Sequence, residues 1–240
     1  MKKLGVIGGL GPIATAYFYE LIIKMTEATV DQEHIEMMIF SKPSIPDRTD
    51  YILGRSLDNP AASIIEIGKM LVTLGADYIA IPCITAHYFH DTLSEEIHTP
   101  IIHIIRETVG YLSDRGIRQA GIMATDGTIY SRLFQEELQA KGIEPLIPSK
   151  RCQGYVTNLI YKDIKANKPP EMDKFNEVAD ELKAMGAEVI ILGCTELSLV
   201  KRDYDIGPGF IDAMEVLAMS SVSLCGGKLK TQYQSLITNK

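Results

Sequence analysis

The sequence predicts an α/β protein made of two similar halves. Apolar runs of strand length alternate with helical patterns, which is typical of parallel sheets with crossover helices. GADYIAIPCITAH from Gly75 and GAEVIILGCTELS from Gly186 share one pattern and place two cysteines in equivalent contexts, 111 positions apart. GVIGGLGPIAT from Gly5 also matches GIMATDGTIYS from Gly121, with an offset of 116. Because the two offsets differ only by a small deletion, we infer an internal duplication.

The first half begins with an apolar strand, Leu4–Gly8, which is followed by a helix from Pro12 to about Glu27 and a strand, Ile35–Phe40. Asn59-Pro60 then opens a helix, since asparagine is favoured at the N-cap and proline in the first turn. This helix is expected to end at Gly75 and to bury one face, made of Ile64, Ile65, Leu71 and Val72. Strand Tyr78–Ile81 is apolar throughout, which predicts burial on both faces.

The second half repeats this order. Gln119–Ala124 is predicted as a strand and Thr128–Lys141 as a helix that stops at Gly142. A further helix ends at Gly186 and is expected to bury Phe175, Val178, Leu182 and Met185. Val189–Leu192 then forms another buried strand.

Composition and charge narrow the class of protein. Hydrophobic residues make up 46% and charged residues 23% of the 240 residues, which is ordinary for a globular protein. The net charge of −7 gives no electrostatic reason to expect nucleic acid or an anionic membrane as a partner. The four cysteines are widely spaced without a CxxC pair, which indicates reduced thiols in a cytoplasmic protein.

The N-terminus has some features of a secretion signal. Lys2-Lys3, an apolar stretch and Ala14-Thr15-Ala16 resemble its three regions. Glycines and Pro12 interrupt the stretch, however, and it continues directly into a helical pattern, so we expect no signal peptide. No uninterrupted apolar run reaches the roughly 18 residues of a membrane span.

Gly9–Ala14 fits the loose G-x-G-x-x-A form of the dinucleotide fingerprint. The fingerprint also requires an acidic residue at the end of the next strand, which here reads Phe40-Ser41-Lys42. Lys42 could pair with the 2′-phosphate of NADP, so an NADP-dependent enzyme remains an open alternative. We favour a tight turn at Gly9 whose backbone N–H groups face a ligand carboxylate at a helix start.

Cys83, His87 and His90 lie at i, i+4 and i+7, a spacing that could place them on one helical face. A structural zinc site needs a fourth ligand at comparable spacing, and none is nearby. His34, His98 and His103 belong to no motif. We therefore expect surface histidines or hydrogen-bonded core histidines, and no metal.

Cys83 and Cys194 follow the strands that end at Ile81 and Leu192. The carboxyl ends of parallel strands are where α/β sheets bind ligands. If helices start at these cysteines, the helix dipoles are expected to lower the pKa of each thiol from about 8.5 toward neutrality. One thiol from each half could act as base and acid on opposite faces of one carbon, which is the chemistry of a racemase or epimerase.

Six ordered motifs span nearly the whole chain: IGGLGPIAT (Ile7–Thr15), IPDRT (Ile45–Thr49), PCITAH (Pro82–His87), ATDGT (Ala124–Thr128), DIK (Asp163–Lys165) and GCTEL (Gly193–Leu197). Through them the chain closely resembles the cofactor-independent aspartate/glutamate racemase family. The resemblance implies two pseudo-symmetric α/β domains, residues 1–103 plus 209–240 and residues 104–208, with the active site in the cleft between them. It also implies a homodimer whose small-molecule partner is an acidic amino acid, without pyridoxal phosphate, metal or nucleotide.

The resemblance also implies roles for individual residues. Cys83 and Cys194 match the two catalytic cysteines, each acting on one enantiomer. Arg48 and Lys165 match residues that hold the side-chain carboxylate of the substrate, a task for which a guanidinium is well suited. Thr85, Thr125 and Thr195 match hydroxyl and backbone donors around the α-carboxylate. Asp47 and Glu196 are candidates for ordering thiol or ammonium protons, with surface carboxylates as the alternative.

Ile84 departs from the family pattern, which usually reads Cys-Asn-Thr at the first thiol. Isoleucine cannot make the amide contact, so either the substrate differs, the role has moved, or activity is weaker. The second cysteine argues against one-cysteine decarboxylases, and Arg48 with Lys165 argues for a second carboxylate on the ligand. Three alternatives stay open: an isomerase or decarboxylase of a small diacid, a non-catalytic protein that binds acidic amino acids, and a Rossmann-type oxidoreductase.

Overall fold

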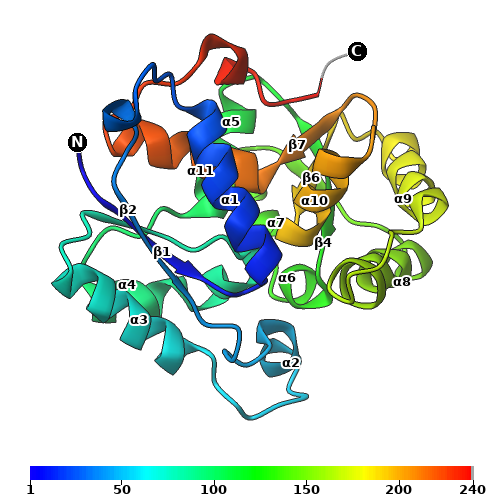
Figure 1. Cartoon of the computed structure of the whole chain (residues 1–240). Coiled ribbons are helices and arrows are strands. Elements are labelled where there is room, and N and C mark those ends of the chain that lie inside the picture. Colours follow the sequence, from blue (N-terminus) through cyan, green and yellow to red (C-terminus); the bar gives the residue numbers. More distant parts are fainter. Residues whose placement is uncertain (239–240) are drawn as a thin grey trace.

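A computed structural model describes residues 1–238 as two parallel β-sheets flanked by helices (Figure 1). In the first sheet the strand order is β2-β1-β3, and in the second it is β5-β4-β6-β7. The strands are β1 (Leu4–Gly8), β2 (Met37–Ser41), β3 (Tyr78–Ala80), β4 (Gln119–Ala124), β5 (Glu144–Leu146), β6 (Val189–Gly193) and β7 (Phe210–Asp212). The expected α/β class with two similar domains is confirmed.

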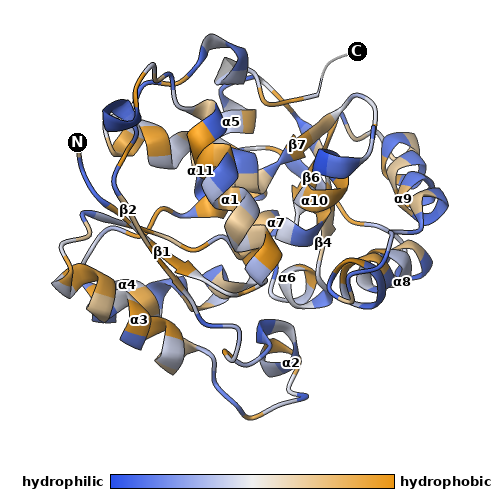
Figure 2. Cartoon of the chain, in the orientation of Figure 1, coloured by the Kyte–Doolittle hydropathy of each residue, from blue (hydrophilic) through white to orange (hydrophobic). Residues whose placement is uncertain are grey.

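Helices connect the strands and cover both sheets, with apolar residues on their inner sides (Figure 2). They are α1 (Pro12–Met25), α2 (Arg48–Ile52), α3 (Ala61–Thr73), α4 (His90–Ile97), α5 (Ile104–Ser113), α6 (Asp126–Tyr130), α7 (Leu133–Ala140), α8 (Lys150–Asn158), α9 (Met172–Ala184), α10 (Thr195–Asp203) and α11 (Ala213–Leu224). Short 3₁₀ turns form η1 (Asp31–Glu33), η2 (Ile84–Phe89) and η4 (Thr231–Gln234), and η3 (Leu159–Ile164) is a π-helical turn.

The strand register repeats between the two sheets. Gly5 of β1 pairs with Ile79 of β3, and Gly121 of β4 pairs with Ile190 of β6. These two pairs are related by the same offsets, 116 and 111, that relate the sequence motifs. The duplicated motifs therefore mark equivalent places in the two sheets.

The two paired glycines have the same packing role. A Cβ atom on Gly5 would lie 3.1 Å from Leu71 and 3.0 Å from Ala76, and one on Gly121 would lie 3.2 Å from Leu182 and 3.3 Å from Ala187. Leu71 and Leu182 belong to the equivalent helices α3 and α9. Glycine at these positions thus lets each helix lie close against its central strand.

The end of the chain contributes to both halves. Strand β7 pairs with β6 in the second sheet. The chain then returns to the first half, since the N–H of Lys2 donates to the carbonyl of Cys225 at 3.0 Å. Helix α11 lies against both α1 and α5. The two sheets are thus separate, but the boundaries 1–103 plus 209–240 and 104–208 stay a prediction.

Two predicted segments differ in detail. The helix expected at Thr128–Lys141 begins at Asp126, because the Thr125 hydroxyl caps it, and it breaks at Arg132, where φ is 57°. Met185 does not join the buried face of α9, because it lies beyond the last turn and is 46% exposed.

Strand β3 is the last strand of the first sheet in the order β2-β1-β3. Ile79 and Ala80 are buried as expected, whereas Tyr78 is partly exposed, and Ile101 adds a parallel bridge to Ile79 beyond the strand.

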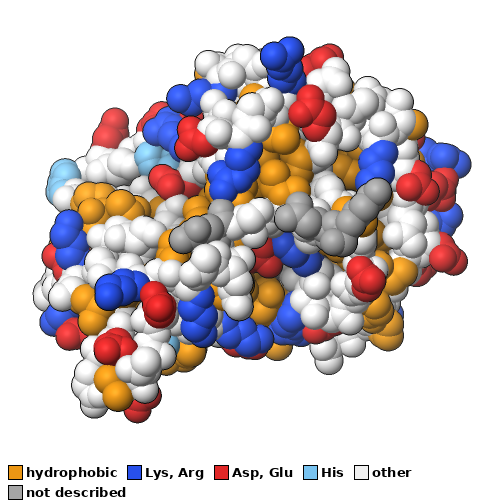
Figure 3. Space-filling model, turned by 90° about the horizontal axis from the view of Figure 1, so that it is seen from above, with side chains coloured by type: hydrophobic (Ala, Val, Ile, Leu, Met, Phe, Trp, Pro, Cys, Tyr) orange, Lys and Arg blue, Asp and Glu red, His pale blue; other side chains and the backbone are white. Residues whose placement is uncertain are grey.

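The surface seen from above carries Lys, Arg, Asp and Glu side chains interspersed with apolar ones (Figure 3). Among residues 1–238, none of the helices has the length and apolar character needed to cross a membrane.

Gly9→Ala should destabilise the fold more than Gly54→Ala. Gly9 has φ +89°, and a Cβ there would lie 2.5 Å from the backbone nitrogen of Lys42, whereas Gly54 has φ +69° and nothing within 4 Å. Strain at positive φ alone costs about 1–2 kcal/mol, so Gly54→Ala should lose about this much free energy of unfolding. Gly9→Ala should lose clearly more, because of the backbone clash. Urea unfolding followed by circular dichroism measures both, and equal losses would contradict this account of the turn.

Candidate active site

The two cysteines of the duplicated motif line the same small cavity, of about 10 Å³. All the predicted site residues except Gly9 line it as well: Asp47, Arg48, Thr85, Thr125, Lys165, Thr195 and Glu196. Residues from both halves of the chain therefore meet at one point. The volume is enough for about one water molecule.

A larger cavity of about 520 Å³ lies next to it. The two share five lining residues: Leu10, Asp47, Arg48, Lys165 and Glu196. Gly9 lines the larger cavity only, and its N–H donates to the Thr15 hydroxyl at 2.9 Å. The N–H of Gly9 is thus engaged within the turn, and a ligand in this cavity would have to use donors other than this one.

Cys194 directly follows β6 and occupies the N-cap position of α10. Its thiol donates to Glu196 Oε2 at 2.9 Å. Burial and the negative charge of Glu196 raise the pKa of Cys194 well above its ordinary value, and they outweigh the opposite effect of Lys165. The expectation that the helix start lowers this pKa is therefore wrong for Cys194. The thiol is protonated at neutral pH.

Glu196 is a buried carboxylate, only 4% exposed, and not a surface one. Its second oxygen lies 3.5 Å from Lys165 Nζ. Burial alone would lower the pKa of Lys165, but Glu196 and Cys194 raise it, and the net shift is upward. Lys165 follows the π-helical turn η3, a feature that is common at functional sites.

Cys83 lies beyond the end of β3 and starts the 3₁₀ turn η2. Arg48 is its cationic neighbour. Burial would lower the pKa of Arg48, but interactions with Cys83 and with Asp47 raise it, and the net shift is upward. Arg48 donates to the carbonyl of Pro46 at 2.9 Å, while its Nε is buried without a partner among the described residues.

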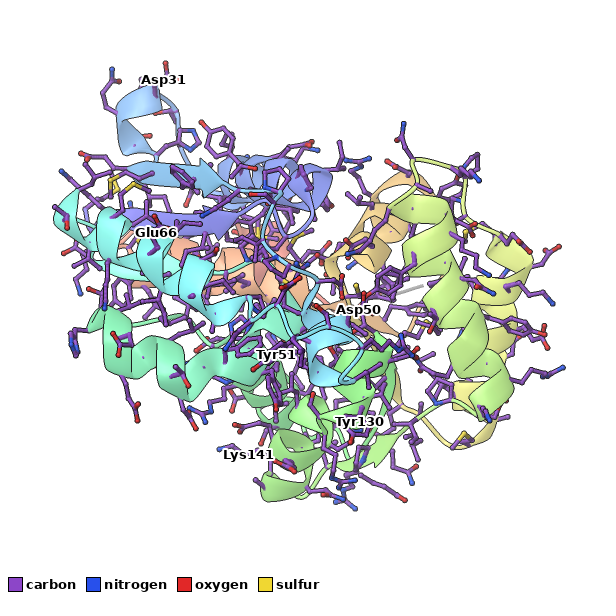
Figure 4. The ribbon with its side chains drawn as sticks, turned by 90° about the horizontal axis from the view of Figure 1, so that it is seen from below. Asp31, Asp50, Tyr51, Glu66, Tyr130 and Lys141 are labelled. Carbon is purple, nitrogen blue, oxygen red and sulfur yellow. The ribbon has the colours of Figure 1, made fainter. Side chains whose placement is uncertain are left out.

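Helix α2 holds Arg48 against the second half of the chain. Asp47 caps this helix by accepting the N–H of Asp50 at 3.1 Å. A Cβ on Gly127 of α6 would lie 3.0 Å from the Cα of Thr49, so the two helices are in close contact. Figure 4 shows α2, marked by Asp50 and Tyr51, beside α6, at whose end Tyr130 is labelled.

Three threonine hydroxyls form a closed triangle across the two halves. Thr85 lies 3.0 Å from both Thr125 and Thr128, which are 3.1 Å apart. Thr128 was not among the predicted site residues. Its place in ATDGT, three residues after a capping threonine, is the sequence signal that points to it.

Sequence reasoning also missed Tyr161. Its ring lies under Lys165, with Nζ 4.9 Å from the ring centroid, and its hydroxyl donates to Asp47 at 3.5 Å. Burial raises the pKa of Tyr161, so the hydroxyl stays a donor. No motif in the sequence signals this residue.

The His87 side chain contacts the backbone of Cys83. Its Nδ1 lies 3.1 Å from the carbonyl of Cys83, and its Nε2 lies 3.4 Å from both the N–H of Ile104 and the carbonyl of Ile102. Burial lowers the pKa of His87 to about 4. The rings of His90 and His103 lie nearby, with centroids 4.4 Å apart. Within residues 1–238 no group of three ligands is arranged to hold a metal.

The model of the Asp/Glu/hydantoin racemase family matches residues 7–220. The chain belongs to this family. It is therefore an enzyme of a racemase family, as the motifs predict.

Individual relatives match over nearly the whole chain. A broad specificity amino-acid racemase, RacX of Bacillus subtilis, is 29% identical over 226 residues, which cover 92% of this chain and 96% of the relative. The structure of an aspartate racemase from Picrophilus torridus superposes with a TM-score of 0.85 at 28% identity and covers 98% of both chains. A glutamate racemase from Francisella tularensis in complex with D-glutamate shares the fold, with a TM-score of 0.68 at 18% identity, over 100% of this chain and 84% of that one.

Acid should destabilise the protein through His87. The unfolded chain binds this proton below about pH 6.5, whereas the folded protein binds it only near pH 4. The unfolded state thus holds more protons in this window, and the free energy of unfolding should fall by up to about 3 kcal/mol as the pH decreases through it. Urea unfolding at several pH values measures the slope. His87→Gln should flatten it, and the exposed control His98→Asn should not; an unchanged slope in His87→Gln would refute the assignment.

Glu196→Gln should make Cys194 more reactive. Loss of the carboxylate removes a charge that raises the pKa of Cys194, so more thiolate forms at pH 8. Alkylation by iodoacetamide, quantified by mass spectrometry of the Cys194 peptide, should be faster than in the wild type. The exposed Glu95→Gln variant is the control. Equal or slower alkylation in Glu196→Gln would mean that the carboxylate does not hold the thiol proton.

Proposed function

We propose that this protein racemises an acidic amino acid, aspartate or glutamate, by proton transfer between two thiols without pyridoxal phosphate. The observation that carries the proposal is one cavity lined by Cys83 and Cys194, one from each half of the chain. A planar carbanion has two faces, and a proton donor on each side is what inversion at Cα requires. The names of the relatives, a broad specificity racemase and an aspartate racemase, agree with this reaction class.

Two cations suit a substrate with two carboxylates. Arg48 and Lys165 both line the cavity. The Nε of Arg48, which has no partner among the described residues, could donate a hydrogen bond to a ligand oxygen. A guanidinium can bind a carboxylate through two parallel hydrogen bonds. Lys165 is already paired with Glu196, so a substrate carboxylate would share or replace this contact.

The two thiols differ before substrate binds. The Cys83 sulfur has the Arg48 guanidinium as its charged neighbour, while burial and Glu196 hold the Cys194 thiol protonated. In one direction Cys83 removes the α-proton and becomes a thiol, and Cys194 gives its proton to the opposite face and becomes a thiolate. In the other direction the roles exchange, with Glu196 in place to accept the proton of Cys194.

The carbanion must be stabilised without an electron sink. Donors aimed at the α-carboxylate can supply this electrostatically, because they stabilise the charge that develops in the transition state. Thr85 and Thr125, whose hydroxyls lie 3.0 Å apart, line the cavity together with Cys83. Thr195, at the start of α10, lies beside Cys194.

Substrate binding requires the cavity walls to separate, since about 10 Å³ does not hold an amino acid. The adjoining cavity, with Arg48 and Lys165 on its wall, is the route of entry. Ile84 lines the inner cavity with an apolar side chain that packs into the core. We also propose a homodimer in the reducing cytoplasm, where the four free cysteines stay reduced.

Incubation with single enantiomers of aspartate and glutamate in deuterium oxide, without added cofactor, tests the function. The product of opposite configuration should carry deuterium at Cα. Cys83→Ser and Cys194→Ser should each slow the reaction at least about a hundredfold, as expected for loss of a general acid or base. Cys152→Ser and Cys225→Ser are matched controls, because these buried thiols do not line the cavity.

Other outcomes would point elsewhere. Wild-type rates in both Cys83→Ser and Cys194→Ser would refute the two-thiol mechanism. Turnover of maleate or of a substituted malonate, without racemisation, would indicate a diacid isomerase or decarboxylase. Thermal stabilisation by an acidic amino acid without any exchange at Cα would indicate a binding protein.

A further inference from the structure

Two pairs of side chains join helix α10 to the segment formed by the end of β7 and the start of α11. Ser198 of α10 donates its hydroxyl to Asp212 Oδ1 at 2.7 Å. About one turn further along α10, Lys201 Nζ lies 2.7 Å from Glu215 Oε2. The residues of each pair are 14 positions apart, so the pairs follow one another along the two helices, which are in contact (Figure 1).

The Ser198–Asp212 pair is completely buried, with both residues 0% exposed. Asp212 Oδ1 also caps α11 by accepting the N–H of Met214 at 2.9 Å. The other oxygen, Oδ2, is buried without a partner among residues 1–238, and burial of an unpaired polar atom costs free energy. A serine would suffice as a cap at this place. The cap therefore does not explain why a buried carboxylate reaches Ser198.

Ser198 lies at the end of α10 that carries the candidate site. The helix begins directly after Cys194, and Glu196 is in its first turn. Ser198 follows Cys194 by four residues, so the two lie on the same side of the helix. The Cys194 thiol donates to Glu196 and makes no capping hydrogen bond. The Ser198 hydroxyl, by contrast, fixes this end of α10 to another element.

We propose that Ser198 and Asp212 are positioning residues for Cys194 and Glu196. Their hydrogen bond fixes the rotation and depth of α10, and with it the place of the thiol and of its carboxylate partner. Neither Ser198 nor Asp212 lines the two cavities, so they act through the helix and not on the substrate. Proton transfer requires donor and acceptor within hydrogen-bond reach. The inference rests on the proposed role of Cys194 in racemisation.

Cys83 is held by other parts of the chain. Its turn η2 packs against α2, α4, α5 and α6, and His87 contacts its carbonyl at 3.1 Å. Loss of the Ser198–Asp212 hydrogen bond should therefore displace the Cys194 thiol and leave the Cys83 thiol in place. This difference separates positioning from a general loss of stability.

Ser198→Ala removes the hydrogen bond and leaves the Lys201–Glu215 pair intact. It should lower kcat for racemisation about tenfold or more, because a displacement of about 1 Å can slow a reaction about a hundredfold. KM should change little, since the substrate-binding cations are untouched. Ser221→Ala is the matched control: Ser221 is also 0% exposed and donates to the Leu217 carbonyl at 2.7 Å within α11, and this variant should keep the wild-type kcat.

Two substitutions of Asp212 separate the cap from the hydrogen bond to Ser198. Asp212→Ser retains a side chain that can cap α11 but is too short to reach Ser198, so it should lower kcat as Ser198→Ala does. Asp212→Asn keeps the accepting oxygen and should keep kcat near the wild-type value. The double variant Ser198→Ala/Asp212→Ser should be no slower than the slower single variant, because both changes remove the same hydrogen bond. Urea unfolding checks that each variant is folded under assay conditions.

Alkylation by iodoacetamide follows the two thiols separately. In Ser198→Ala and in Asp212→Ser the Cys194 peptide should be alkylated several times faster than in the wild type, because a displaced α10 no longer holds the thiol buried against Glu196. The rate at Cys83 should stay unchanged. This measurement needs no turnover, so a wild type that racemises no amino acid would refute the proposed function, while alkylation of Cys194 would still decide the positioning.

Three results would overturn the proposal. The first is a wild-type kcat in Ser198→Ala or in Asp212→Ser. The second is a double variant whose loss of kcat equals the product of the two single losses, because the two residues would then act independently. The third is an equal acceleration of alkylation at Cys83 and Cys194, which would indicate a general loosening of the fold.

Discussion

The buried carboxylate of Glu196 constrains the side chains around it, above all Cys194 and Lys165. A charge that is 4% exposed needs compensation, and here it comes from the Cys194 thiol, the Lys165 ammonium and the start of α10. Gly11 of the first half leaves space for this carboxylate, because a Cβ on Gly11 would lie 3.0 Å from Glu196 Oε1. Glu196 thus acts with burial to keep Cys194 protonated, and it pairs with Lys165.

The duplication explains why the two thiols meet. Each cysteine follows a strand adjacent to the central strand of its sheet, in the same register, with the same close packing of a helix over a glycine. The copies are not equal, however. Cys83 has Arg48 as its neighbour and Cys194 has Glu196, so one repeat presents a thiol beside a cation and the other a thiol beside an anion. The two thiols therefore lie in different electrostatic surroundings.

Much of the fold and site could be predicted because the relevant patterns are local. Strand β4 has the expected bounds, Cys194 occupies the N-cap position of a helix, and the left-handed glycines Gly75 and Gly186 follow their helices. The errors have non-local causes. The pKa of Cys194 depends on burial by both halves, which no dipole argument from one helix includes. Tyr161 reaches Asp47, 114 positions away, and no spacing rule detects such a contact.

By itself, the sequence determined the α/β class, the repeat, the family and the residues that gather at the site. Periodicity, turn residues and ordered motifs are local properties of the chain, so they can be recognised without knowing which residues are in contact. Only the tertiary structure decided that Glu196 is buried and that Thr128 completes a hydroxyl triangle. These facts depend on which surfaces the two halves cover when they pack, and burial then sets charge, protonation and exposure.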